Sequence, residues 1–285
     1  MTKIIAEIGC NHKGDFEIAK RLITIAKKCG ANVAKFQKRN NKSLLTKKEY
    51  NQPHPEPWNS YGNTYGEHRE ALEFTKEQHE ELKKICDDHD IIYSSSVWDL
   101  TSATEISSIK AEMIKIPSAT NLDFEMQKYL CDNFTGKIHL SVGMTDNTEL
   151  ADIINFYKLE KRIDDLVLYC CTSGYPINFD EICLLEIRKL QDLLRGTQAA
   201  IGFSGHHLGI APDIAAMTLG VKWIERHFTL DRTWKGTDHA ASLEPEGLRR
   251  LCRDVENVQK ALKYKSKAIL PIEEAQRIKL KKLDF

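Results

Sequence analysis

The sequence predicts a single-domain (β/α)₈ TIM barrel, which belongs to the α/β class. Short runs rich in β-branched residues alternate eight times with longer amphipathic stretches between residues 3 and 262, and this alternation is typical of parallel strands joined by right-handed crossovers. Eight units fit a closed barrel better than an open doubly wound sheet, which usually has fewer strands. No Gly-x-Gly-x-x-Gly motif follows the first run, which argues further against a dinucleotide-binding sheet.

The first strand is expected at 3–10 and the first helix at 15–29, where Phe16, Leu22, Ile23 and Ala26 recur at helical spacing and Gly30 ends the helix. The remaining strands are expected at 33–38, 91–97, 113–118, 138–143, 166–171, 200–205 and 222–228. The remaining helices are expected at 75–87, 102–109, 124–131, 148–157, 179–194, 211–219 and 245–262.

One long connection, residues 39–74, interrupts this rhythm with three prolines and several aromatic residues. Connections of this length are either functional or disordered, and the aromatic and charged residues favour an ordered lid over the active face. The barrel domain, lid included, is expected to span 1–265. The charged segment 266–285 is expected to be a short tail without a second domain.

Composition limits the classes of partner. Forty-one basic residues balance forty-one acidic ones, so no charge excess favours nucleic acid or a membrane surface. No apolar stretch reaches the length of a membrane span or of a signal peptide. The eight cysteines form no Cys-x-x-Cys pair, which favours a reduced cytoplasmic protein.

Polar residues gather at the carboxyl ends of the predicted strands, where barrels of this kind place their active sites. They are Glu7, Lys35, Gln37, Ser94, Ser95, Ser96, Lys115, Ser118, Ser141, Thr172, Ser173, Ser204, His206, Glu225 and His227. Two lysines, several hydroxyls and nearby glycines make a mouth suited to phosphate, because lysine supplies charge and hydroxyls supply donors.

His206 and His227 follow adjacent predicted strands, so their imidazoles are candidate ligands of one ion. Two nitrogen ligands completed by oxygen atoms favour Mn²⁺ or another divalent ion in open coordination over structural zinc. The neighbouring His207 has no such position and is expected to pack against the protein or face solvent.

The other charged candidates have more than one interpretation. Lys35 and Lys115 are suited to clamp an anion, to pair with a buried carboxylate such as Glu7, or to form a Schiff base. Glu7 and Glu225 are candidates for general acid–base catalysis or for binding hydroxyl groups. Asp238, after the last strand, either orients a sugar hydroxyl or caps a turn.

Eight segments of the chain together resemble the sialic acid synthase family. In sequence order along residues 3 to about 262, they read AEIGCNHKGD, VAKFQK, YGNTYGEHREALEF, KIPSATN, LSVGMT, YCCTSGYP, IGFSGHHLG and ERHFTLDRTWKGTDHAASLEP. The family condenses phosphoenolpyruvate with an N-acylmannosamine, or with its 6-phosphate, to give a nine-carbon 2-keto acid. The TYGEHR and TWKGTDHAASLEP runs resemble the animal-type synthases that use the 6-phosphate sugar.

The resemblance implies a role for each candidate residue. Phosphoenolpyruvate contacts fall on Lys35, Lys115, Ser118, Ser141 and Ser204, with Ser173 nearby. The divalent ion, Mn²⁺ or Mg²⁺, falls on His206 and His227. Contacts to the acceptor sugar fall on Glu7, Gln37, Tyr175 and Asp238. Glu7, Lys35, Glu225 and Asp238 are the candidate catalytic residues.

Three departures from the family pattern bear on the acceptor. Thr120 stands where many members carry an acid, and Ser173 stands where bacterial members often carry asparagine. The resemblance also ends near the tail, without the small antifreeze-like domain whose arginine reaches the N-acetyl group in most members. An acceptor without that group fits this pattern, and a homodimer formed between barrels is compatible with it.

We therefore expect a metal-dependent nonulosonate synthase that condenses phosphoenolpyruvate with mannose, an N-acylmannosamine or a 6-phosphate of either. Two alternatives remain open at the level of sequence. One is a Schiff-base aldolase on the same barrel, and the other is a catalytically inactive barrel that binds a sugar phosphate.

Overall fold

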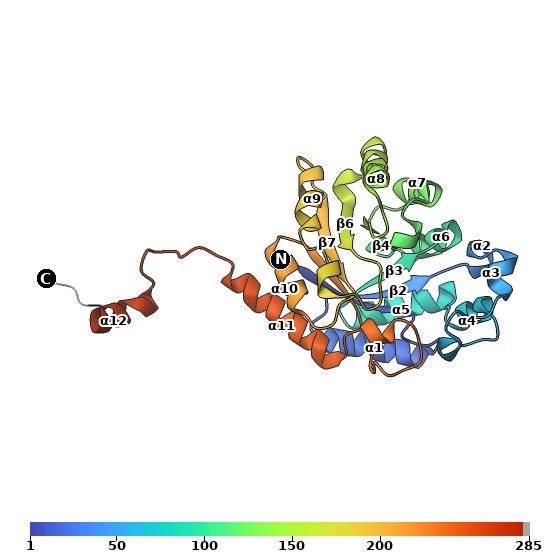
Figure 1. The fold of residues 1–285 in the computed structure, drawn as a ribbon, viewed down its shortest axis with the longest axis horizontal. Helices are drawn as coiled ribbons and strands as arrows, with labels where there is room; N and C mark the ends of the chain where they lie inside the picture. The colour runs from blue at the N-terminus through green and yellow to red at the C-terminus, as the bar shows by residue number, and fades with distance from the viewer. Residues whose placement is uncertain (282–285) are drawn as a thin grey trace.

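The computed structural model describes residues 1–281 and confirms the predicted barrel (Figure 1). Eight parallel strands pair in sequence order, and β1 closes the barrel by pairing with β8. The strands are β1 (Lys3–Gly9), β2 (Val33–Lys38), β3 (Ile92–Val97), β4 (Met113–Ile116), β5 (Lys137–Ser141), β6 (Leu166–Cys171), β7 (Ala200–Gly205) and β8 (Trp223–His227).

A helix follows each strand on the outside of the barrel. These helices are α1 (Phe16–Lys28), α5 (Lys76–Asp88), α6 (Leu100–Ser108), α7 (Phe124–Asn133), α8 (Asn147–Leu159), α9 (Glu186–Leu193), α10 (Ala211–Thr218) and α11 (Pro245–Ala261). The helix predicted over 179–194 is wrong in its first half. Phe179–Glu181 forms only a 3₁₀ turn, and Cys183 has a φ of 52°, a left-handed conformation that a helix interior excludes, so α9 begins at Glu186.

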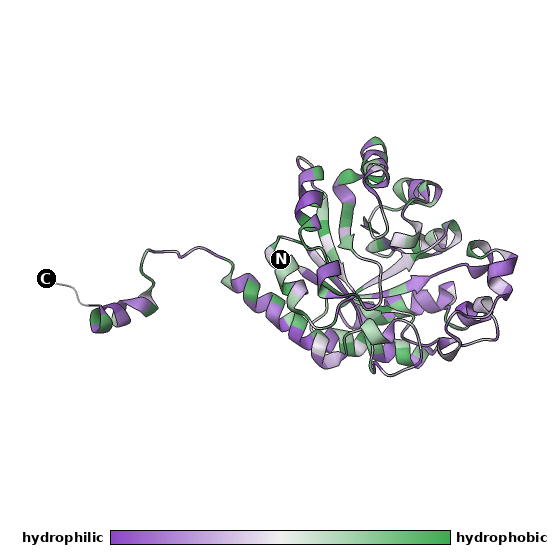
Figure 2. Ribbon diagram, in the orientation of Figure 1, coloured by the Kyte–Doolittle hydropathy of each residue, from purple (hydrophilic) through white to green (hydrophobic). Residues whose placement is uncertain are grey.

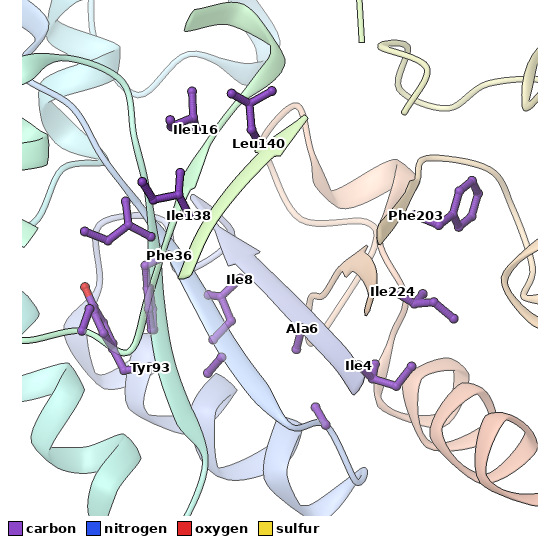
Figure 3. Close-up of a cluster of buried hydrophobic side chains, with 14 of the residues drawn as sticks. Ile4, Ala6, Ile8, Phe36, Tyr93, Ile116, Ile138, Leu140, Phe203 and Ile224 are labelled. Atoms are coloured by element: carbon purple, nitrogen blue, oxygen red, sulfur yellow. The ribbon is translucent and has the colours of Figure 1, made fainter. Parts of the chain in front are cut away.

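Side chains alternate between the two faces of each strand, and this alternation separates the core from the site. Ile4, Ala6 and Ile8 of β1 point outward into the main hydrophobic core between strands and helices (Figure 3). The positions between them point into the barrel, where Ile5 joins a second apolar cluster. That inner cluster is Ile5, Val33, Met113, Val167, Tyr169 and Trp223.

The inner cluster closes the bottom of the barrel and places the charged residues above it. Two residues after an apolar member of the cluster, each of four strands carries a charged side chain on the same face: Glu7 in β1, Lys35 in β2, Lys115 in β4 and Glu225 in β8. Because side chains on one face of a strand recur at every second residue, these acids and lysines come together directly above the inner apolar cluster.

The long connection between β2 and α5 is folded. It contains α2 (Asn41–Leu44), α3 (Lys47–Asn51), a 3₁₀ turn (Pro57–Asn59) and α4 (Tyr65–Ala71). The Tyr61 hydroxyl donates to the Lys235 carbonyl oxygen at 2.5 Å, and the Gly236 amide donates to Asn59 Oδ1 at 3.2 Å. These bonds join this segment, hereafter the lid (residues 39–74), to the loop that follows β8.

The segment after α11 leaves the barrel (Figure 1). It carries one more helix, α12 (Pro271–Leu280), which has no buried residue and shows apolar and polar residues side by side along its length (Figure 2). Residues 282–285 of the expected tail lie outside the described residues. Among residues 1–281, no helix combines the length and apolar character needed to cross a membrane.

Candidate active site

A cavity of about 860 Å³ lies at the carboxyl end of the strands. All thirteen candidate residues line it: Glu7, Lys35, Gln37, Lys115, Ser118, Ser141, Ser173, Tyr175, Ser204, His206, Glu225, His227 and Asp238. Residues far apart in sequence converge here because parallel strands of a closed barrel all end at the same rim.

Two lysines and two acids form the floor of the cavity, and all four side chains are buried. Lys35 forms a salt bridge with Glu7 and donates to Ser96 Oγ at 2.7 Å. Lys115 Nζ lies 3.0 Å from Glu225 Oε2. Lys35 Nζ also lies 3.7 Å from Glu225 Oε1, so the carboxylate of Glu225 stands between the two ammonium groups.

The surroundings shift the pKa values of Glu7 and Glu225 in opposite directions. Burial raises the pKa of Glu7, although the adjacent Lys35 acts in the opposite direction. Burial also disfavours the charged form of Glu225, but Lys115 and Lys35 together outweigh it and lower the pKa of Glu225 to about 2. Glu225 is therefore the acid of the floor that the two lysines hold in its charged form. Glu7, which accepts from Gln37 Nε2 at 2.8 Å, is the acid better suited to bind and release a proton.

His206 and His227 face one another at the rim. Their ring centroids are 5.5 Å apart, and the Tyr175 ring packs 4.1 Å from His206 and 5.7 Å from His227. Burial, with a contribution from His227, lowers the pKa of His206 to about 3. Nδ1 of His206 lies 2.8 Å from the Thr172 carbonyl oxygen, so Nδ1 carries the proton and Nε2 keeps its lone pair.

A buried ion pair between β8 and α10 holds the loop that carries His206. Arg226 of β8 bonds to the Asp213 carboxylate of α10, and both side chains are fully buried. Arg226 also donates to the His207 carbonyl oxygen at 2.6 Å, and the His207 ring lies 3.2 Å from Asp213. His207 is thus buried inside the protein. These bonds hold the backbone next to His206 in place.

The residues at the rim fit a divalent ion with open coordination. Nδ1 of His227 is buried without a hydrogen-bond partner among residues 1–281, and Asp238 Oδ2 is 3.7 Å away. The described part of the chain contains no group of three or more His, Cys, Asp or Glu side chains arranged to hold a metal. An ion here would take two imidazoles, and substrate or water oxygens would complete its coordination, as in catalytic rather than structural sites. Asp238 makes no capping bond to the turn that it precedes, so the capping interpretation is wrong.

The serines gather on the side of the cavity opposite β1. The Gly143 amide donates to Ser118 Oγ at 3.0 Å, and a Cβ at Gly143 would lie 2.4 Å from Ser173 Oγ. Two hydroxyls and a glycine backbone are therefore packed into one corner. Thr120 does not line the cavity, and its hydroxyl is buried without a partner in the described residues.

The lid supplies cavity residues that the sequence did not single out. Arg39, Glu56, Asn59, His68, Arg69 and Leu72 all line the cavity, together with Trp98 after β3 and Arg232 and Trp234 after β8. The signal available in the sequence was the concentration of Arg, His and Trp in the two connections that follow β2 and β8. Neither connection has a periodicity that would place individual side chains.

Known proteins share both the sequence and the fold. The NeuB family matches residues 22–267. Human N-acetylneuraminate-9-phosphate synthase is 37% identical over 98% of this chain and 76% of the human one. N,N'-diacetyllegionaminic acid synthase of Campylobacter jejuni is 34% identical over 92% of this chain and 77% of its own length.

Solved structures agree with these matches. The N-acetylneuraminic acid (sialic acid) synthetase from Leptospira borgpetersenii, solved in complex with citrate, superposes with a TM-score of 0.81 and 27% identity, covering 98% of this chain and 92% of that one. A DAHP synthase from Thermotoga maritima shares the fold alone, at 13% identity and a TM-score of 0.70. The resemblance seen in the motifs is confirmed, and the chain belongs to the NeuB family.

Proposed function

We propose that this protein is a nonulosonate synthase, which condenses phosphoenolpyruvate with a mannose-type sugar and releases phosphate. One observation carries the proposal: a pair of buried lysines forms the floor of the same cavity whose rim holds two facing histidines. The floor suits a small dianion or trianion, and the rim suits the carbonyl end of a sugar.

Phosphoenolpyruvate carries its carboxylate and its phosphate close to the same carbon, and two lysines with surrounding serines match these groups. With Glu7 and Glu225 ionised, the four floor groups sum to zero charge. An incoming anion raises the pKa of Glu7 further, and a protonated Glu7 leaves the floor at +1. Substrate binding therefore favours uptake of a proton from solvent by Glu7, and the next step uses this proton.

The reaction balances with these groups. Carbon 3 of the enol attacks the aldehyde carbon of the open-chain sugar, and the aldehyde oxygen takes a proton, which we assign to Glu7. Positive charge develops at carbon 2, next to the Glu225 carboxylate. Water adds at carbon 2 and gives one proton back to Glu7. The bond between carbon 2 and the phosphate oxygen then breaks, and the second proton of the water leaves with phosphate as the keto group forms. Lysines and serines position the enol phosphate without a covalent intermediate.

We propose His206 and His227 as ligands of a divalent ion, Mn²⁺ or Mg²⁺. When bound, such an ion would polarise the acceptor carbonyl as a Lewis acid. Tyr175 packs on both imidazoles and fixes their orientation, and Asp238 lies beside His227 on the side of the acceptor.

The test is phosphate release measured with both substrates and with each alone. The proposal predicts release only when phosphoenolpyruvate and a mannose-type acceptor are present together, and loss of turnover on chelation of the ion. Release from phosphoenolpyruvate alone contradicts it, and so does a failure of every mannose-type acceptor, which would favour the inactive barrel.

A Schiff-base aldolase is the second candidate, because burial lowers the pKa of Lys115 despite the adjacent Glu225. An imine needs a neutral lysine, whereas Lys35 and Lys115 each form a salt bridge with a buried carboxylate. Borohydride treatment in the presence of pyruvate distinguishes the two reactions. Our proposal predicts no covalent adduct by mass spectrometry, and an adduct on either lysine would favour the aldolase.

A further inference from the structure

Two arginines meet at the outer end of the cavity, away from the lysines of the floor. Arg39 directly follows β2, and Arg69 belongs to α4 of the lid. Their guanidinium carbons lie 4.3 Å and 5.5 Å from the ring centroid of Trp98, and all three residues line the cavity. Elements distant in sequence therefore bring two positive charges to one indole.

This arginine pair has hydrogen-bond donors without acceptors. Nε of Arg39, Nε of Arg69 and Nε1 of Trp98 are all buried, and none has a partner among residues 1–281. An unpaired buried donor costs about 1–3 kcal/mol, so most buried donors in folded proteins are satisfied. Three unsatisfied donors around one side chain indicate that an acceptor is missing.

The net charge of the surrounding residues indicates which charge the missing acceptor carries. Arg39, which is 5% exposed, pairs with Glu73 at 3.2 Å. Arg69 has no salt-bridge partner in the described part of the chain, which leaves the group at about +1. Burial and the nearby charge of Arg39 lower the pKa of Arg69, as expected of a guanidinium without a counter-ion. The missing acceptor is therefore an anion, and a phosphate offers enough oxygens for several donors.

The arginine pair is separated from the anion site of the floor. Strand residues rise about 3.3 Å each, so the Cα atom of Arg39 lies about 13 Å beyond that of Lys35. Gln37 stands between them, since its Oε1 accepts from Arg39 and its Nε2 donates to Glu7. The two anionic groups of phosphoenolpyruvate share one carbon, so when the lysines and serines of the floor hold both of them, neither is left for the arginines. The outer anion belongs to the second substrate.

We infer that Arg39, Arg69 and Trp98 form a subsite for the terminal phosphate of the acceptor, so that the substrate is a phosphorylated sugar rather than a free one. This inference rests on the proposed function, which leaves open whether the acceptor carries phosphate. The acceptor then spans the cavity with its carbonyl at the histidines and its phosphate under the lid.

The relatives of this chain include synthases named for both kinds of product. The human relative is named for a 9-phosphate, and the Campylobacter relative is named for an acid without phosphate. The arginine pair gives a physical reason to place this chain with the phosphate-dependent reaction.

The experiment compares N-acetylmannosamine with its 6-phosphate, and mannose with mannose 6-phosphate, in the full-length protein and in Arg69→Gln. We expect the wild type to prefer the phosphorylated acceptor at least 100-fold in kcat/KM. Arg69→Gln lowers that preference at least 10-fold through KM of the acceptor, with a smaller change in KM of phosphoenolpyruvate. Arg69→Lys restores part of the preference, because charge returns without the planar fork. Arg188→Gln, on the exposed face of α9, leaves the preference unchanged.

Equal kcat/KM for the phosphorylated and free acceptors in the wild type would overturn the inference, as would an unchanged preference in Arg69→Gln. Calorimetry with mannose 6-phosphate and mannose decides the matter independently of turnover. We expect the wild type to bind mannose 6-phosphate more tightly than mannose, and Arg69→Gln to weaken binding of mannose 6-phosphate at least 10-fold. Equal affinity of the wild type for the two sugars would overturn the subsite. Absence of phosphate release with all acceptors would count against the proposed function. The calorimetric affinities would still test the phosphate subsite in that case.

Discussion

Lys115 Nζ lies 3.0 Å from Glu225 Oε2, and the other oxygen of the same carboxylate lies 3.7 Å from Lys35 Nζ. The carboxylate of Glu225 thus stands between two ammonium groups that would otherwise repel each other in the floor of the cavity. Burying these charges costs desolvation free energy. Their mutual pairing, together with the bonds of Lys35 to Ser96 and Glu7, offsets this cost. The floor thus holds two lysines in fixed positions, each paired with a carboxylate.

Replacing the central acid should destabilise the protein. Glu225→Gln removes the charge that balances Lys115 and Lys35, and breaking a buried pair costs about 3–5 kcal/mol. The free energy of unfolding in urea measures this loss. Glu246→Gln is the matched control, because Glu246 pairs with Arg249 and Arg250 on the exposed surface of α11 and should leave that free energy nearly unchanged. A Glu225→Gln protein as stable as the control would contradict the pairing.

The same variant has a defined pH dependence. The pKa of Glu225 is lowered to about 2 in the folded protein from an ordinary value of 4.5. Its contribution, on the order of 3 kcal/mol, is therefore fully present above pH 4.5 and is lost as the pH falls toward 2. The stability difference between wild type and Glu225→Gln should be constant above about pH 5 and shrink between pH 4.5 and 3. A difference that grew on acidification would have the wrong sign.

The two rim histidines should be needed together. His206→Ala and His227→Ala each remove one of two nitrogen ligands, so each should abolish turnover and weaken Mn²⁺ binding at least 10-fold while the circular dichroism of the barrel is retained. Electron paramagnetic resonance of free Mn²⁺ during titration measures binding without turnover. His89→Ala, at the end of α5 and outside the cavity, is the control. Mn²⁺ binding that survives both rim variants unchanged would remove the histidines from the site.

Gly143 should be sensitive to a single methyl group. An alanine Cβ at this position would lie 2.4 Å from Ser173 Oγ and 2.8 Å from Ser118 Oγ, closer than any normal contact. Gly143→Ala should therefore displace the serine corner and raise KM for phosphoenolpyruvate at least 10-fold. Gly247→Ala, in α11 and away from the cavity, should leave KM unchanged. An unaltered KM in Gly143→Ala would show that the corner does not bind this substrate.

A second glycine pair tests how the lid is attached. Gly14 has a φ of 75°, and a Cβ there would lie 2.1 Å from the carbonyl oxygen of Ala71, the last residue of α4. Gly196 has a φ of 86° but nothing within 4 Å of its would-be Cβ. Gly196→Ala therefore carries only backbone strain, of order 1 kcal/mol. Gly14→Ala adds a clash with α4 and should destabilise the protein by at least about 2 kcal/mol and raise KM for the acceptor. Equal effects of the two substitutions on unfolding and on KM would mean that α4 does not depend on this contact.

The sequence predicted the barrel and the inner site because both follow from a short-range rule. Alternation along each strand decides which side chains enter the barrel, and Glu7, Lys35, Lys115 and Glu225 all obey it. The eight candidate residues that lie on strands enter one cavity for this reason. The other five follow the ends of strands and reach the cavity because all strands end at the same rim. These five are Ser118, Ser173, Tyr175, His206 and Asp238.

No comparable sequence pattern predicts which residues form the outer half of the site. Arg69 reaches the cavity only because the lid is held by bonds such as Tyr61 to Lys235, which join residues 174 positions apart. The helix predicted over 179–194 failed for a comparable reason, since the left-handed backbone at Cys183 has no signature in side-chain periodicity. Long-range contacts and local backbone geometry, rather than pattern, decide these parts.

The most direct measurement uses phosphoenolpyruvate labelled with ¹⁸O in the oxygen that bridges carbon 2 and phosphorus, with and without a mannose-type acceptor. Attack by carbon 3 over the lysine floor, followed by water at carbon 2, predicts that the label leaves in phosphate and only when the acceptor is present. Label retained in the keto acid, or phosphate formed at the same rate without acceptor, would contradict this account.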